Sequence, residues 1–390
     1  MNRIVYADYA ASAPISERAL RIYAEVARMP GNPSSLHEAG QAVMERVEKA
    51  RAVVASLIGA DPEEVFFTSG GTEADNWAVF SGFRAGCEAL GLPPVIAVSS
   101  VEHDAVYRSA AEAAARPLPE GMSGGKPQLR LIPVTEGGRA EVPPPGELPE
   151  AALFSVMTAN NETGVIQPVA EWAAAAHRRG ALFHTDAVQA VGQIPVDAHG
   201  WGVDLLSLSA HKLHGPVGVG ALYVRREIAG IFPKFAFGGG QERDRRPGTV
   251  PAALIAAFGE AAEEAGERMA EDAAKTAALR DRIEAELLRL PGARRNGEGE
   301  RLPGIANLSF SGIGGEAAAL LCGLAGVMLS AGSACHAGNE EPSRVLLAMT
   351  GDRDRASSAL RISLGRESTE EDAREIVRAV AAAVEKIRGS

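Results

Sequence analysis

The sequence is poor in cysteine, in positive charge and in long apolar runs. Its 390 residues include three cysteines, Cys87, Cys322 and Cys335, and no C-x-x-C pair, which argues against a disulfide framework or a zinc site. Lysine and arginine number 39 against 50 acidic residues, and the resulting net charge of −11 argues against a nucleic-acid or anionic-membrane partner. There is no signal-peptide core, and no apolar run could cross a bilayer. We therefore expect a cytoplasmic protein without a bound metal, nucleic acid or membrane.

The composition nevertheless supports a large core, since 46% of the residues are hydrophobic. Apolar runs alternate with helical patterns over the first half of the chain, which predicts βαβ units and a largely parallel sheet. An Ala/Glu/Arg-rich segment after residue 251 predicts one or two helices that link two lobes. We expect a large α/β domain at residues 15–255 and a smaller α+β domain formed by residues 1–14 and 256–390.

The stretch from Ser207 to Leu222 contains Lys212 at the point where a buried strand gives way to a glycine-rich turn. An amine held there without water can act as a nucleophile toward a carbonyl. The alternative is a lysine whose chain reaches out to solvent, and for a single lysine this is the commoner case. The other strand ends therefore decide between the two interpretations.

Polar residues also follow the other apolar strands, where ligands of open α/β sheets bind. A Gly pair opens a helix whose free N–H groups favour a phosphate, and a His, an Asn, an Asp and a Gln follow later strands. Each has a structural alternative as a cap, a turn or a buried hydrogen-bonded group. Together they match the needs of pyridoxal 5′-phosphate (PLP). The residues are Gly71, Thr72, His103, Asn161, Asp186 and Gln189.

Ten motifs, spread in order over nearly the whole chain, resemble the cysteine desulfurases (NifS/IscS-like) of the class V aminotransferase-like PLP enzymes. They are YADYAASAP, GNPSSLH, FTSGGTEADN, EHDAV, NNETGVIQP, HTDAVQAVG, SAHKLHGPVGVGALYVR, GGGQERDRRPGT, GSACHAG and ALRISLGR. The resemblance implies a fold-type-I α/β transferase, with a mainly parallel, mixed seven-stranded sheet and a smaller α+β domain. It also implies the reaction of L-cysteine and an acceptor thiol to L-alanine and a persulfide, which supplies sulfur for iron–sulfur clusters, thio-cofactors or tRNA.

The resemblance assigns the cofactor contacts residue by residue. Lys212 is implied to bind PLP covalently and to move the α-proton of the substrate. His103 is implied to stack on the ring, Asp186 to pair with the ring N–H, and Gln189 to hydrogen-bond the phenolic oxygen. Asn161 is implied to contact cofactor or substrate.

The phosphate is implied to be held by the backbone of Gly71 and by the side chains of Thr72, Ser209 and His211. Thr249, in the RRPGT loop, matches a threonine that reaches the phosphate of the neighbouring subunit. A homodimer with composite active sites is therefore implied.

Two further residues are implied to act on the substrate. Arg361 is implied to bind the carboxylate, as suits its planar fork of donors. Cys335 is implied to be the thiolate that attacks the substrate sulfur, whereas Cys322 is expected in the core and Cys87 has no assigned role. Selenocysteine lyase or another class V transaminase or lyase is the alternative. The His-Ala-Gly after Cys335 departs from the family's usual Thr-Ser or Thr-Ala, so the sequence leaves the sulfur-acceptor protein open.

Overall fold

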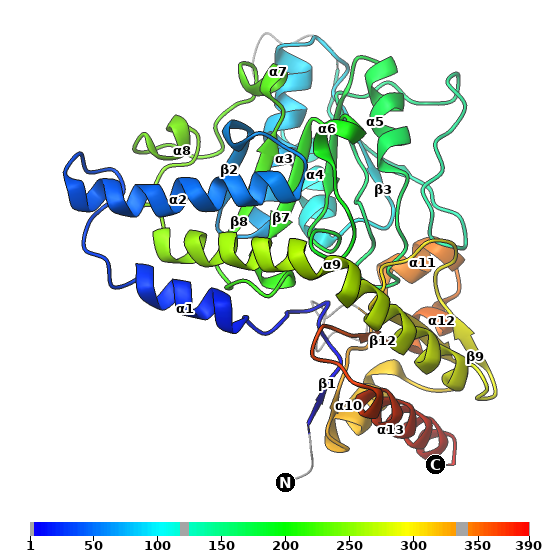
Figure 1. Cartoon of the computed structure of the whole chain (residues 1–390). Helices are drawn as coiled ribbons and strands as arrows, with labels where there is room; N and C mark the ends of the chain where they lie inside the picture. The colour runs from blue at the N-terminus through cyan, green and yellow to red at the C-terminus, as the bar shows by residue number, and fades with distance from the viewer. Residues whose placement is uncertain (1–3, 118–124, 333–341, 390) are drawn as a thin grey trace.

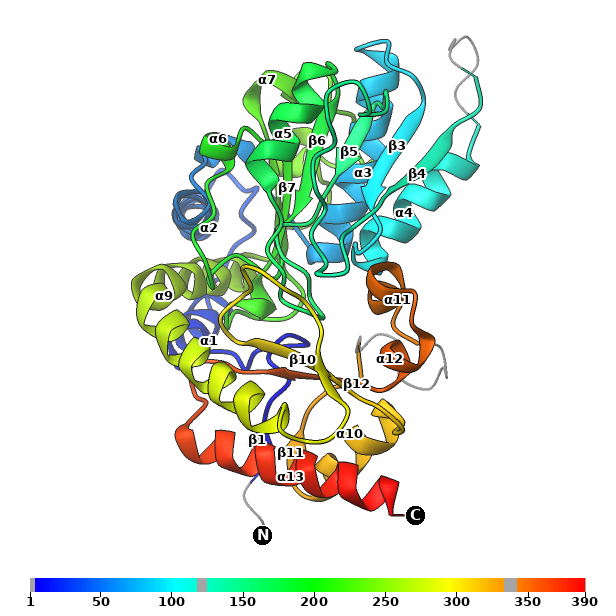
Figure 2. The same cartoon turned by 90° about the vertical axis from the view of Figure 1, so that its right-hand side faces the viewer.

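The computed structural model describes residues 4–117, 125–332 and 342–389. The chain forms two lobes, and one long helix, α9, passes from the upper lobe to the lower (Figure 1). Figure 2 shows the first strand (Val5–Tyr6) and the last helix (Glu370–Arg388) of the chain at the base of the smaller lobe.

A seven-stranded sheet forms the centre of the large lobe. Its order is β2-β8-β7-β6-β5-β3-β4, and β8 runs antiparallel to both of its neighbours while all other pairs are parallel. The predicted fold class, a mixed and mainly parallel sheet, is therefore confirmed. The strands are β2 (Val65–Thr68), β3 (Val95–Ser99), β4 (Gln128–Ile132), β5 (Leu153–Ser155), β6 (Leu182–Asp186), β7 (Leu205–Ser209) and β8 (Gly220–Val224).

Helices cover both faces of this sheet, which explains why its central strands are buried along their whole length. Alternate residues of a strand face opposite sides, so Phe66 packs with one helical layer and Phe67 with the other. The first layer contains α3 (Gly71–Glu88), α4 (Asp104–Ala115) and α7 (Arg226–Ala229), and the second contains α1 (Glu17–Val26), α2 (Glu38–Leu57), α5 (Val169–Arg178) and α6 (Ala198–Trp201). Short elements complete the lobe: η1 (Pro62–Glu64), η2 (Ala210–Lys212) and α8 (Gln241–Asp244).

The predicted linking segment is a single helix, α9 (Ala252–Leu287), of 36 residues. Its first half contributes Ile255 and Phe258 to the core of the large lobe. Its second half contributes Leu279 and Ile283 to the core of the small lobe. One rigid element therefore belongs to both cores.

The small lobe contains a three-stranded antiparallel sheet of order β12-β10-β9 and a two-stranded parallel sheet in which β1 pairs with β11. The first strand of the chain thus joins the C-terminal lobe. The strands are β1 (Val5–Tyr6), β9 (Ala293–Arg295), β10 (Ile305–Phe310), β11 (Val327–Met328) and β12 (Ala359–Ser363), and the helices are α10 (Gly315–Leu324), α11 (Arg344–Thr350), α12 (Arg353–Ser357) and α13 (Glu370–Arg388). Over the described residues, no helix combines the length and the apolar character needed to span a bilayer.

Candidate active site

Lys212 lies in the turn that follows β7, and the N-terminal segment crosses this edge of the sheet. The Lys212 Nζ donates to the carbonyl oxygens of Ala10, at 2.5 Å, and Ala11, at 2.7 Å. Gln189, in the turn after β6, donates from Nε2 to the same Ala10 oxygen at 2.9 Å. The Lys212 amine is therefore held by backbone carbonyls near the start of the chain, and it does not extend into solvent.

Asp186 ends β6, and its side chain is buried. Its Oδ1 accepts a hydrogen bond from the backbone N–H of Val188 at 2.8 Å. Burial raises the pKa of Asp186, and the charges of His103 and Lys212 oppose that rise. The three predicted residues Lys212, Asp186 and His103 therefore lie within electrostatic reach of one another. A buried carboxylate of this kind is stabilised by a protonated partner.

Two more carboxyl groups, those of Asp75 and Glu102, are buried near Asp186. Glu102 Oε1 accepts from Ser99 Oγ at 2.5 Å and from the Met157 N–H at 2.7 Å. Burial raises the pKa of Glu102 to about 8 and raises that of Asp75 well above its usual value, and the Asp186 charge adds to both rises. Burial therefore favours the neutral form of both groups.

His184 supports the same region as a neutral imidazole. Its Nδ1 lies 2.8 Å from Ser155 Oγ and its Nε2 lies 3.0 Å from Ser207 Oγ. Complete burial lowers the pKa of His184 to about 3. It therefore adds no positive charge beside Asp186 at neutral pH, and it serves to hold three neighbouring strands in place.

The start of α3 and the end of β7 form a small cradle at the same edge of the sheet. A Cβ atom added to Gly71 would lie 2.8 Å from Val188 Cγ2 and 3.7 Å from the Cβ of Ser209, so a side chain at residue 71 would fill it. This 18-residue helix begins at Gly71, and the first N–H groups of a helix have no partner within it. Thr72 lies exposed on its first turn. This is the geometry that a phosphate needs.

His211 also lies at this edge, where its Nδ1 is 3.2 Å from Ser12 Oγ. Burial, and then the charge of Lys212, lower the pKa of His211 to about 4. The ring is therefore neutral at physiological pH and acts as a hydrogen-bonding group and not as a cation.

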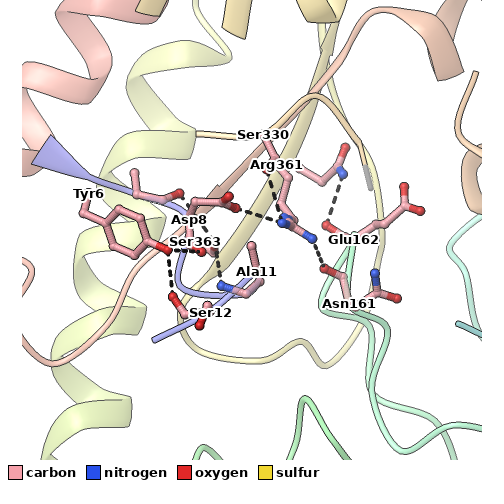
Figure 3. A network of polar contacts seen from close by, with 12 residues as sticks. Tyr6, Asp8, Ala11, Ser12, Asn161, Glu162, Ser330, Arg361 and Ser363 are labelled. Atoms are coloured by element: carbon pink, nitrogen blue, oxygen red, sulfur yellow. Dashed lines mark hydrogen bonds and ion pairs between the residues drawn. The ribbon is translucent and has the colours of Figure 1, made fainter. Parts of the chain in front are cut away.

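Arg361, on β12, joins the small lobe to the large one (Figure 3). Its guanidinium is 2% exposed and donates from Nη2 to Asp8 Oδ1 at 2.8 Å and from Nη1 to the Asn161 carbonyl at 3.0 Å. A weaker contact of 3.4 Å reaches Ser330 Oγ. The predicted substrate-binding residues Arg361 and Asn161 are therefore in direct contact.

Among the site residues that the sequence predicted, three buried polar atoms have no hydrogen-bond partner within the described part of the chain. They are Arg361 Nε, Asn161 Oδ1 and Gln189 Oε1. Unpaired buried polar atoms cost free energy and point to a polar group that binds there. The set contains one cationic donor and two neutral acceptors, which suits a ligand with a carboxylate and with N–H or O–H groups.

Two predicted residues are not placed with this group. Thr249 is exposed in the segment between α8 and α9, where its neighbour Arg246 pairs with Glu73 of α3 at 2.8 Å. Cys335 lies outside the described residues. Cys322 is buried in the core of the small lobe, as expected, and Cys87 is buried on α3. Burial raises the pKa of each of these two thiols to about 11, so neither is a ready nucleophile.

The motifs contained further site residues to which the sequence assigned no role. The carbonyls of Ala10 and Ala11 accept from Lys212, Asp8 pairs with Arg361, and Glu102 borders Asp186. All of them lie within the YADYAASAP and EHDAV motifs. Membership of a matched motif was therefore the available signal, but the partner of each residue depends on the fold.

One group of possible metal ligands, Asp61, Glu64 and His199, comes together in the described chain. The Glu64 carboxylate already accepts from the Arg226 N–H at 2.9 Å and contacts His199 Nε2 at 2.6 Å. The Arg226 guanidinium pairs with Asp61 at 2.8 Å. An arginine therefore supplies the positive charge that these carboxylates need.

Comparisons with known proteins identify the family. Residues 5–376 match the model of the family described as "Aminotransferase class-V". The chain is 40% identical to the cysteine desulfurase of Sinorhizobium fredii, over all of this chain and 98% of that one. It is 41% identical to the cysteine desulfurase NifS of Azotobacter vinelandii, over 92% of this chain and 87% of that one.

Solved structures show the same relationship. A NifS-like protein superposes with a TM-score of 0.86 at 31% identity, over 99% of this chain and all of that one. The shared fold, the full-length sequence matches and the motifs place the chain in one family. The protein belongs to the class V aminotransferase family and, within it, to the cysteine desulfurases.

Proposed function

We propose that this protein uses PLP to convert L-cysteine and an acceptor thiol into L-alanine and a persulfide. The observation that carries the proposal is the grouping of a held amine, Lys212, with a buried acid, Asp186, and His103 at one edge of the sheet. The site residues fit PLP because unpaired buried acceptors and a glycine cradle flank that amine. When bound, PLP withdraws electrons from the substrate Cα, which lets the carbon–sulfur bond break.

Asp186 would hold the ring nitrogen, since its buried carboxylate gains most from an N–H partner. His103 would cover the ring face, and Gln189 would bind the phenolic oxygen. Gly71, with Thr72, Ser209 and His211 around it, would hold the phosphate; the backbone N–H groups and the α3 dipole favour negative charge there. Lys212 would bind the aldehyde and afterwards carry the substrate's α-proton.

Arg361 would bind the substrate carboxylate. Its Nε is buried and unpaired among the described residues, and its other donors are fixed by Asp8 and Asn161. A guanidinium that is already fixed loses little conformational entropy when substrate binds. Asn161 adds an unpaired amide oxygen beside it.

Cys335 would take the sulfur. Its thiolate attacks the sulfur of the substrate, the carbon–sulfur bond breaks, and the electron pair left on the substrate is protonated as alanine is released. Cys335 follows Gly332 by three residues, and a chain spans at most about 3.5 Å per residue, or roughly 11 Å in all. Gly332 lies beside Glu162, the neighbour of Asn161.

We also propose a homodimer with composite sites. Thr249 is exposed, and so are three large apolar side chains: Leu36 (90%), Phe237 (88%) and Val217 (73%). Leu36 lies between α1 and α2 and Phe237 lies before α8, on the same side of the large lobe (Figure 1). Burial of these side chains against a second copy would remove apolar surface from water and bring Thr249 to the partner's phosphate cradle.

The division into residues 15–255 and residues 1–14 with 256–390 remains a proposal, as does a cytoplasmic location, which the sparse, unpaired cysteines favour. The sulfur would serve iron–sulfur clusters, thio-cofactors or tRNA through an acceptor protein. The desulfurase matches favour cysteine over the selenocysteine lyase and transaminase alternatives.

The test compares wild type, Lys212→Ala and Cys335→Ser by visible absorbance and by alanine formation from cysteine. Lys212→Ala should lose the covalent cofactor band and all alanine formation. Cys335→Ser should keep the band and lose the persulfide. Full alanine formation by Cys335→Ser, or a transamination product in place of alanine, would overturn the proposal.

A further inference from the structure

Gly332 and Ser343 lie close together in the fold. A Cβ atom added to Gly332 would lie 3.6 Å from the Cβ of Ser343 and 3.8 Å from Glu162 Oε2. Ser343 Oγ donates to the same Glu162 oxygen at 2.5 Å. The carboxylate of Glu162, from the large lobe, is therefore the point at which Gly332 and Ser343 meet.

Glu162 is itself fixed through its backbone. Its N–H donates to Asn160 Oδ1 at 3.0 Å, and its carbonyl accepts from Asn307 Nδ2, on β10, at 3.1 Å. The residue is 3% exposed. A buried residue whose backbone is bonded on both sides has little freedom to shift, so its carboxylate acts as a fixed reference point for Ser343.

The turn that holds Glu162 is also tied to the cofactor and substrate residues. Asn160 donates from Nδ2 to the carbonyl of Val101, two residues before His103, at 2.9 Å. The carbonyl of Asn161 accepts from Arg361 at 3.0 Å. The turn that contains Glu162 is thus hydrogen-bonded to the segment before His103 on one side and to the Arg361 guanidinium on the other.

We propose that Glu162 is a positioning residue for sulfur transfer. Its carboxylate fixes where the segment containing Cys335 leaves and rejoins the fold, directly beside the pocket that holds the substrate carboxylate. The inference rests on the proposed function, because it assigns Cys335 the sulfur-accepting role. Glu162 would act through Ser343, to which it is bonded, and through the adjacent Gly332.

Two reactions of the holoenzyme separate positioning from a general structural effect. Alanine formation from cysteine needs Cys335. Exchange of the α-proton of L-alanine for deuterium in D2O needs Lys212 and Arg361 but no thiol. Glu162→Ala should lower kcat for alanine formation by about 10- to 100-fold, the loss expected for one hydrogen bond to a charged group. The exchange rate and the KM for cysteine should stay within about threefold.

Conservative variants supply the controls. Glu162→Gln keeps an oxygen that accepts from Ser343 and should retain most of the activity. Ser343 also caps α11 by accepting from the Leu346 N–H at 3.1 Å. Ser343→Thr keeps both roles, whereas Ser343→Asp keeps the cap but sets a carboxylate against Glu162. We expect Ser343→Thr to be active and Ser343→Asp to lose alanine formation while it keeps exchange.

A parallel loss of both reactions in Glu162→Ala and Ser343→Asp would overturn the inference, because it would show a collapsed substrate pocket. Unchanged alanine formation in both variants would overturn it as well. A wild-type protein that exchanges the alanine proton but never forms alanine from cysteine would instead overturn the proposed function.

Discussion

Asp8 and Arg361, 353 residues apart in the sequence, form an ion pair of 2.8 Å in which the arginine is almost wholly buried. Removal of one partner from a buried pair leaves the other charge uncompensated. Asp8 therefore orients the guanidinium. In the proposed complex, the substrate carboxylate would share this cation with Asp8 and bind at the buried, unpaired Nε.

Arg361→Lys should raise the KM for cysteine by about 10- to 100-fold, because a lysine keeps the charge but loses the planar fork. Steady-state kinetics of alanine formation provide the measurement. Arg353→Lys, an exposed position on α12, is the matched control and should leave KM unchanged. An unchanged KM in Arg361→Lys would remove Arg361 from the substrate-binding role.

Glu102→Gln should flatten the pH dependence of stability between pH 6.5 and 8. An unfolded chain loses the Glu102 proton near a pKa of about 4.3, whereas burial raises its folded pKa to about 8. The folded protein therefore holds a proton that the unfolded chain has released, and the unfolding free energy falls as pH rises through this window. His184, with a folded pKa of about 3, contributes a pH dependence only below about pH 6.5.

Urea unfolding followed by tryptophan fluorescence measures this effect, since Trp77, Trp172 and Trp201 all lie in the large lobe. As pH rises, the free energy of unfolding of wild type should fall by up to about 1 kcal/mol per pH unit relative to that of Glu102→Gln. Equal slopes for the two proteins would contradict an ionisation of Glu102 in this window.

Complementation between inactive subunits tests the composite site. Thr249→Asp sets a carboxylate against a phosphate, and Lys212→Ala removes the amine, so each homodimer should be inactive. Coexpression should restore about one quarter of wild-type activity, since half of the dimers are mixed and each has one intact site. If Thr249 serves its own subunit, the mixture should stay inactive.

The buried pair of Arg51 and Glu242 provides a stability prediction. Arg51 binds both oxygens of Glu242, at 2.8 and 2.9 Å, and Glu242 also accepts from the Phe67 N–H. Arg51→Met should lower the unfolding free energy by about 3–5 kcal/mol, because it leaves a buried carboxylate unpaired. Arg84→Met, which breaks an exposed pair with Glu88, should cost less than about 1 kcal/mol. Urea unfolding compares the two variants.

The fold class could be predicted because apolar strands and helices alternate along the sequence. The strand ends also indicated which residues meet, since parallel strands end at one edge of a sheet. The structure brings Lys212 and Gln189 together through one shared carbonyl oxygen, that of Ala10, as expected for neighbouring strand ends.

The sequence could not predict the contacts that distant segments of the chain make with the site residues. That the N-terminal carbonyls accept from Lys212 depends on the return of β12, more than 350 residues later, to fix the N-terminal segment. The neutral state of Glu102 likewise depends on burial between segments that the local pattern does not relate. Local periodicity contains no information on such long-range contacts.

This return of the chain also determines when the enzyme can become active during synthesis. Ser363 accepts from the Ala10 N–H at 2.9 Å and donates its own N–H to the Ala7 carbonyl at 2.8 Å. A nascent chain that has completed the large lobe still lacks this support for the segment that holds the Lys212 amine, and it lacks Arg361. Under the roles proposed for Lys212 and Arg361, almost the whole chain must therefore be synthesised before the amine and the group that binds the substrate lie together.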